Sequence, residues 1–69
     1  MRMVIDPYSP DGNAFAIMGY VKKFLTLTNR LDEWPAVQMD MMKADYKHLC
    51  EVASSATGGV VTVASREHA

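Results

Sequence analysis

The stretch DPYSPDGNAFAIMG, residues 6–19, decides the fold, because turn-forming residues give way there to an apolar helical pattern. Its first half contains two prolines, a glycine and several short polar residues, which favour turns. From Ala14 onward, apolar residues recur three and four positions apart, which predicts an amphipathic helix over residues 13–28. Asp11 or Asn13 can cap this helix by accepting a backbone N–H bond. The apolar stripe consists of Ala14, Ile17, Met18, Val21, Phe24, Leu25 and Thr28.

A phosphate-binding loop is the alternative interpretation of the same stretch. Such a loop uses several glycines and a Lys-Ser/Thr pair at the start of the helix. Here Gly12 is followed by Asn-Ala-Phe-Ala, and the first lysine is Lys22. We therefore interpret the stretch as a stiff, capped entrance to a helix. Gly19 lies inside that helix, which indicates that another backbone crosses closely at this point.

Two strands and two further helices are expected around this helix. They are a strand over residues 2–6, a helix from Asp32 to about Lys43, a helix capped by Asp45 and ended by Thr57-Gly58-Gly59, and a strand over Val60–Val63. The expected fold is a small α+β single domain over residues 1–69, in the order β-α-α-α-β. Two strands are marginal alone, so we expect the terminal strands to pair, antiparallel, against a three-helix layer. Residues 65–69 are expected to form a frayed tail.

Composition excludes several classes of protein. The 69 residues carry a net charge of −1, which does not provide the basic face that a dedicated nucleic-acid binder needs. The single cysteine, Cys50, excludes an internal disulfide and suits a reducing compartment, so we expect a cytoplasmic protein. No apolar run approaches the roughly 20 residues that span a bilayer.

No catalytic or metal-binding constellation is visible in the sequence. His48 and Cys50 lie two positions apart on a predicted helix, so they point to different sides of it. Asp6 and Asp11 share the entry loop, but too few further oxygen ligands accompany them for a calcium site. We therefore predict a protein that is not an enzyme and that has no cofactor and no metal.

Apolar surface is the remaining candidate for function. Met39, Met41 and Met42 cover more than half the circumference of one helix, so at least one of them should point away from a small core. These methionines either fill irregular gaps in the core or form, with Trp34, an adaptable patch for a partner. The candidate residues on this helix are Trp34, Gln38, Met39 and Met42. The second candidate is the unpaired edge of the Val60–Val63 strand, with Val61 and Val63, which a partner strand or a second copy could extend.

The sequence resembles a group of short proteins found in tailed bacteriophages and their prophages. The shared opening D-x-x-x-P-D-G-N-A-F-x-I-M-G corresponds to residues 6–19, and a later D-Y-x-x-L segment corresponds to residues 45–49. The resemblance covers roughly two-thirds of the chain and implies a phage accessory protein that binds host machinery. It implies no catalytic or binding residue.

The leading hypothesis is a non-enzymatic phage accessory protein that binds a host protein as an inhibitor or modulator. One alternative is a small nucleic-acid-binding regulator that uses Lys22, Lys23 and Arg30. Another is a self-assembling structural or accessory protein, in which strand edges pair across a homodimer.

Overall fold

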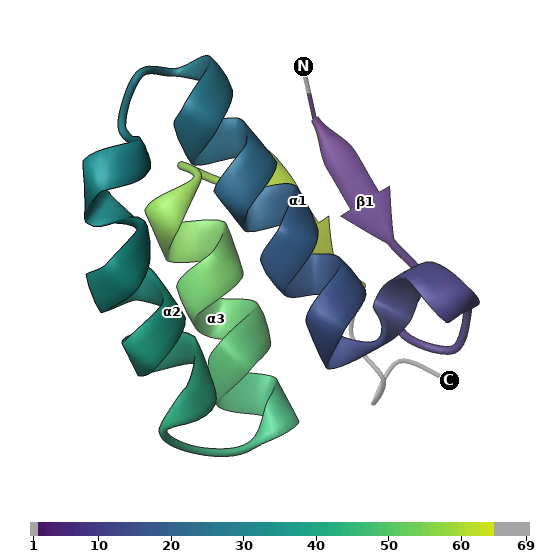
Figure 1. Cartoon of the computed structure of the whole chain (residues 1–69). Coiled ribbons are helices and arrows are strands. Elements are labelled where there is room, and N and C mark those ends of the chain that lie inside the picture. Colours follow the sequence, from purple (N-terminus) through teal and green to yellow (C-terminus); the bar gives the residue numbers. More distant parts are fainter. Residues whose placement is uncertain (1, 65–69) are drawn as a thin grey trace.

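The computed structural model describes residues 2–64 and has the predicted β-α-α-α-β order (Figure 1). The elements are β1 (Met3–Ile5), α1 (Ala14–Leu27), α2 (Trp34–Met42), α3 (Tyr46–Ala56) and β2 (Val61–Val63). Two short 3-10 turns, η1 (Pro10–Gly12) and η2 (Leu31–Glu33), precede α1 and α2. The α+β class and the pairing of the terminal strands are thus confirmed. The predicted tail, residues 65–69, lies outside the described residues.

The two strands pair in parallel, so the antiparallel prediction is wrong. Met3 lies opposite Val61, and Ile5 lies opposite Val63. The reason is visible in Figure 1, where the chain reverses its direction at each of the connections from β1 through α1, α2 and α3 to β2. Three helices between the strands give four connections and therefore four reversals. An even number of reversals returns the chain to its first direction, so the two strands run parallel.

The predicted stripe of α1 forms the centre of the core. Ile17, Val21 and Leu25 are fully buried, and Met18 is nearly so. Asn13 caps the helix, because its Oδ1 accepts a bond of 2.8 Å from the N–H of Ala16. The predicted helix over residues 13–28 is therefore confirmed to within one residue at each end.

The entry loop before α1 is closed by its own polar groups. The backbone N–H of Tyr8 donates to the Asp6 carboxylate at 2.9 Å, and the N–H of Ser9 donates to the Asp6 carbonyl at 3.1 Å. Gly12 is buried against this turn, and a Cβ on it would lie 2.5 Å from the Asp6 carbonyl oxygen. The prediction for Gly19 is wrong, since a Cβ there would meet nothing within 4 Å. Gly12, not Gly19, is thus the glycine that permits a close approach.

The starts of α2 and α3 differ in how they are capped. Asp45 caps α3 as predicted, because its Oδ1 accepts a 2.9 Å bond from the N–H of His48. Asp32 does not cap α2, since it lies inside η2, and Glu33 occupies the cap position without a side-chain bond. At the other end of α3, Gly58 and Gly59 adopt positive φ angles of 62° and 85°, which turn the chain toward β2.

The core lies between α1, α3, the inner side of α2 and one face of the sheet. Its buried apolar side chains are Ile5, Ile17, Met18, Val21, Leu25, Met41, Leu49, Ala53 and Val61. Within residues 2–64, no helix is long and apolar enough to cross a membrane.

Candidate functional site

One side of α2 packs on the core. Trp34 and Val37 are partly buried against it, and Met41 is fully buried. These residues lie three and four positions apart, which places them along one side of the helix. Met41 is therefore a core residue, as the gap-filling interpretation of the methionines predicts.

The opposite side of α2 is apolar and exposed. Met39 is 73% exposed and Met42 is 61% exposed. Pro35, four positions before Met39, is exposed as well and lies on the same side of the helix, and Leu31, in η2 just before α2, is also exposed. We call Leu31, Pro35, Met39 and Met42 the α2 surface. Two of the three clustered methionines thus point away from the core, which confirms the expectation that at least one would.

The predicted residues Trp34 and Gln38 border the α2 surface. Both are half-buried. Gln38 follows Trp34 by four positions and precedes Met42 by four, so these side chains are neighbours along the helix. The structure therefore brings Trp34, Gln38, Met39 and Met42 together on one continuous strip that runs from the edge of the core to solvent.

A paired arginine and glutamate flank the start of the α2 surface. Arg30 donates from Nε and Nη2 to the two carboxylate oxygens of Glu33, at 2.8 and 2.9 Å. This bidentate bond lowers the pKa of the Glu33 carboxyl and raises the pKa of the Arg30 guanidinium. Both groups are therefore charged at neutral pH and satisfy each other. They form a polar rim beside an apolar strip.

A second polar cluster joins α2 to α3. Asp40 accepts from His48 Nε2 across the two helices at 3.0 Å, and Lys43 Nζ lies 3.2 Å from the same carboxylate oxygen. The bond to His48, and then the one to Lys43, lower the pKa of the Asp40 carboxyl. This cluster was not predicted from the sequence. The sequence does place Asp40 and His48 on either side of the short connection between two helices. Side chains in such positions can meet when the helices pack antiparallel, so this pair could have been predicted.

The predicted strand-edge residues do not belong to the α2 surface. In Figure 1, α2 and β1 lie at opposite sides of the molecule, with α1 between them, and β2 lies behind α1. Val61 is only 3% exposed, so its side chain is part of the core and cannot contact a partner. The backbone N–H of Val61 donates to Thr57 Oγ1 at 3.0 Å. This bond uses one of the backbone donors on the strand edge that was predicted to be open. Val63 is partly buried against the core.

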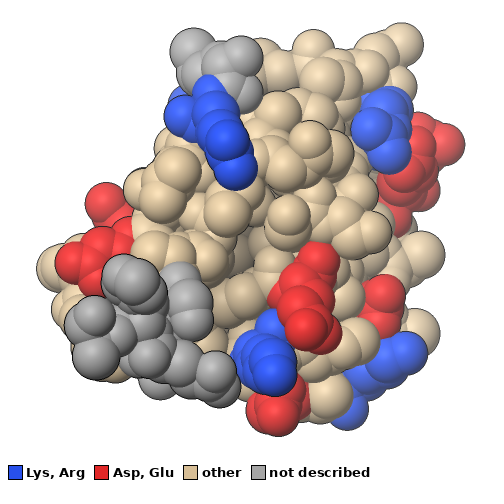
Figure 2. Space-filling view, turned by 180° about the vertical axis from the view of Figure 1, so that it is seen from behind, with Lys and Arg blue, Asp and Glu red and all other residues tan. Residues whose placement is uncertain are grey.

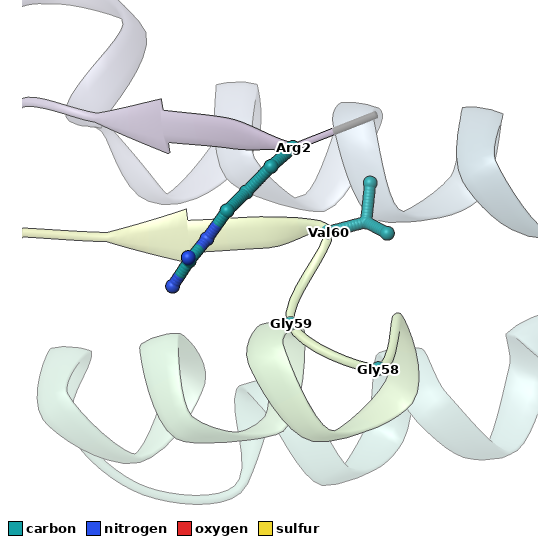
Figure 3. A pocket seen from close by; sticks show the side chains of 4 residues that line it. All are labelled: Arg2, Gly58, Gly59 and Val60. Atoms are coloured by element: carbon teal, nitrogen blue, oxygen red, sulfur yellow. The ribbon is translucent and has the colours of Figure 1, made fainter.

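Other surfaces of the described chain offer less chemistry. An open hollow beside β2 is lined by Arg2, Gly58, Gly59 and Val60, and Arg2 is its only charged residue (Figure 3). In the view from behind, charges of both signs are interspersed among uncharged side chains (Figure 2). Within residues 2–64, no three His, Cys, Asp or Glu side chains come together where they could share a metal ion.

Comparison with known proteins adds no relative: no family model matches the chain, and neither the curated proteins nor the solved structures give a significant match.

Proposed function

We propose that this protein is a non-enzymatic phage accessory protein that uses the α2 surface to bind a host protein and modulate it. The observation that carries the proposal is the pair Met39 and Met42, which are 73% and 61% exposed beside the half-buried Trp34. The phage context and the host partner come from the resemblance of residues 6–19 and 45–49 to phage proteins.

The make-up of the α2 surface supports a protein partner. Methionine is flexible and polarizable, so it adapts to irregular apolar surfaces. Aromatic residues and methionine are enriched at the centres of protein interfaces, where charged residues are depleted. Of the charged residues beside this surface in the sequence, Arg30 and Glu33 bond to each other and Asp40 bonds to His48 and Lys43, whereas Asp32, next to Leu31, is exposed. A partner that covers the stretch from Pro35 to Met42 would therefore bury apolar side chains beside charges that are already paired.

The nucleic-acid alternative receives less support from the same region. Of its three proposed residues, Arg30 already makes a bidentate bond to Glu33. Lys22 and Lys23 are exposed on α1, and two lysines would neutralise few phosphates.

Affinity capture from a host-cell lysate tests the proposal. We expect the wild-type chain to recover a stoichiometric partner, and the double variant Met39→Gln/Met42→Gln to lose it. The matched control is Phe15→Gln/Leu27→Gln, which removes two exposed apolar side chains from α1 and should retain the partner. Recovery of no stoichiometric partner, or equal recovery by both double variants, would contradict the proposal.

A further inference from the structure

At the centre of β1, the backbone groups on the edge that faces away from β2 make no hydrogen bond within residues 2–64. The N–H of Met3 donates to the carbonyl of Val60 at 2.6 Å, and the carbonyl of Ile5 accepts from the N–H of Ala64 at 2.8 Å. Met3 and Ile5 thus direct their backbone groups toward β2. Because successive residues of a strand direct these groups to opposite edges, the N–H and C=O of Val4 point away from β2. The Val4 side chain is 64% exposed.

The sheet is small for a parallel one. Each strand has three residues, and no third strand joins them within residues 2–64. Parallel sheets are normally covered on both faces, and a two-stranded sheet is marginal alone. In Figure 1, β1 lies at one side of the molecule, and no described strand or helix lies alongside it on the side away from β2. An added strand would therefore find this edge accessible.

We infer that a second copy of this chain adds its own β1 to this edge, antiparallel, about a two-fold axis that passes beside Val4. A two-fold contact is self-complementary, so the central residue must lie opposite itself. Val4 meets this requirement, because its outward N–H and C=O would bond to the C=O and N–H of Val4 in the second copy. The dimer has a four-stranded sheet in the order β2-β1-β1-β2.

Charge complementarity favours a second copy over an unrelated strand. With Val4 opposite Val4, Arg2 lies opposite Asp6 of the second copy, and Asp6 lies opposite its Arg2. Both residues are exposed, and opposite charges in directly facing positions stabilise antiparallel strands. Figure 3 shows the Arg2 side chain crossing β2 toward the Gly58-Gly59 turn, so it must rotate toward the outer edge of β1 to face Asp6 of the second copy.

The same register defines where the new ladder ends. The Asp6 N–H can donate to the Arg2 carbonyl of the second copy. The Asp6 carbonyl, however, already accepts from the N–H and hydroxyl of Ser9, at 3.1 and 2.8 Å. Pro7 then follows and has no N–H. The pairing is thus limited to residues 2–6, which fits a reversible dimer.

Site-directed cross-linking tests the register. Facing residues that exchange both backbone bonds have Cα atoms about 5.5 Å apart, which is within the range that a disulfide bridges. In a Cys50→Ala background, Val4→Cys should therefore form a disulfide-linked dimer under mild oxidation. Thr62→Cys is the matched control, because Thr62 is paired with Val4 but lies on β2, separated from its counterpart by both β1 strands. Equal cross-linking of the two variants would overturn the inference.

Sedimentation equilibrium tests the dimer without cross-linking, and it needs no host protein, so its outcome is independent of the proposed function. The apparent mass should rise with concentration toward twice the 7.7-kDa monomer mass. Val4→Pro should keep the chain monomeric, because it removes an N–H that β1–β2 pairing does not use. Arg2→Asp should raise the dimer dissociation constant about tenfold or more, while Lys22→Asp, the same charge change on α1, should leave it within about twofold. A monomeric mass up to millimolar concentration, or unchanged association of Arg2→Asp, would overturn the inference.

Discussion

The hydroxyl of Tyr46, the first residue of α3, donates a hydrogen bond to the carbonyl of Gly12, the last residue of η1, across 34 positions of the sequence. A second tyrosine acts on the same turn, since the Tyr20 hydroxyl donates to the Asp11 carboxylate at 3.0 Å. The entry loop is therefore fixed from two helices, α1 and α3. It positions the helices relative to β1, which is the structural role that its prolines and glycine predicted.

Replacing Tyr46 with phenylalanine should lower the free energy of unfolding by about 1 kcal/mol, because a partly buried carbonyl loses its partner. In a domain of this size, that loss lowers Tm by roughly 4–8 °C. Urea and thermal denaturation followed by circular dichroism measure the two quantities. Tyr20→Phe is the control, since its bond is exposed, and its effect should be smaller. Equal effects would mean that the Tyr46 bond contributes nothing beyond a surface contact.

Alanine at Gly12 and at Gly19 should have opposite effects on stability. At Gly12, the new Cβ would lie 2.5 Å from the Asp6 carbonyl oxygen and 2.7 Å from backbone atoms of Pro7, so the loop must move. We expect a loss of about 1–3 kcal/mol or more, as for overpacked sites. At Gly19, the Cβ meets nothing within 4 Å, and alanine should gain about 0.5–1 kcal/mol from its helix propensity. Thermal unfolding of the two variants measures the difference, and a destabilised Gly19→Ala would contradict the packing described above.

These two glycines also show where prediction from sequence fails. The cap at Asn13 and the stripe of α1 were predictable, because both depend on residues within a few positions of each other. The close contact of Gly12 depends on how the loop folds back on Asp6, and no local pattern encodes that path. The exposure of Gly19 could have been predicted, because the stripe of Ile17, Val21 and Leu25 lies on the opposite side of α1.

The parallel direction of the strands and the closed part of the β2 edge were missed for different reasons. The parallel direction could have been predicted by counting the reversals between β1 and β2. The closed part of the β2 edge could not have been predicted in this way. The Thr57 hydroxyl accepts from the N–H of Val61 only because the Gly58-Gly59 turn brings the chain back over the end of α3. The α2 surface was largely predictable, since three methionines in four positions cannot all face one core.

Stability should fall in acid partly because of Asp40. Its carboxyl has a lowered pKa in the folded chain, through its bonds to His48 and Lys43. The folded state therefore gains stability above the ordinary aspartate pKa of about 3.9, and this gain is lost as the pH falls through the lower, folded value. Asp40→Asn should lower Tm by a few degrees at pH 7 and by almost nothing near pH 2. Glu51→Gln, on the exposed side of α3, is the control and should change Tm little at either pH. A Tm difference for Asp40→Asn that persists at pH 2 would show that the loss is not electrostatic.

Substitutions of the three clustered methionines should affect stability differently, because one methionine is buried and the other two are exposed. Met41 is fully buried, so Met41→Ala should lower the free energy of unfolding by about 2–5 kcal/mol, through lost burial and the cavity it leaves. Met39→Gln and Met42→Gln each replace an exposed side chain with a polar one of similar length and helix propensity, so each should change stability by no more than about 0.5 kcal/mol. Urea denaturation of the three variants measures these values. If Met39 or Met42 proved as costly to replace as Met41, that methionine would belong to the core, and the α2 surface would lose the residue on which its proposed role depends.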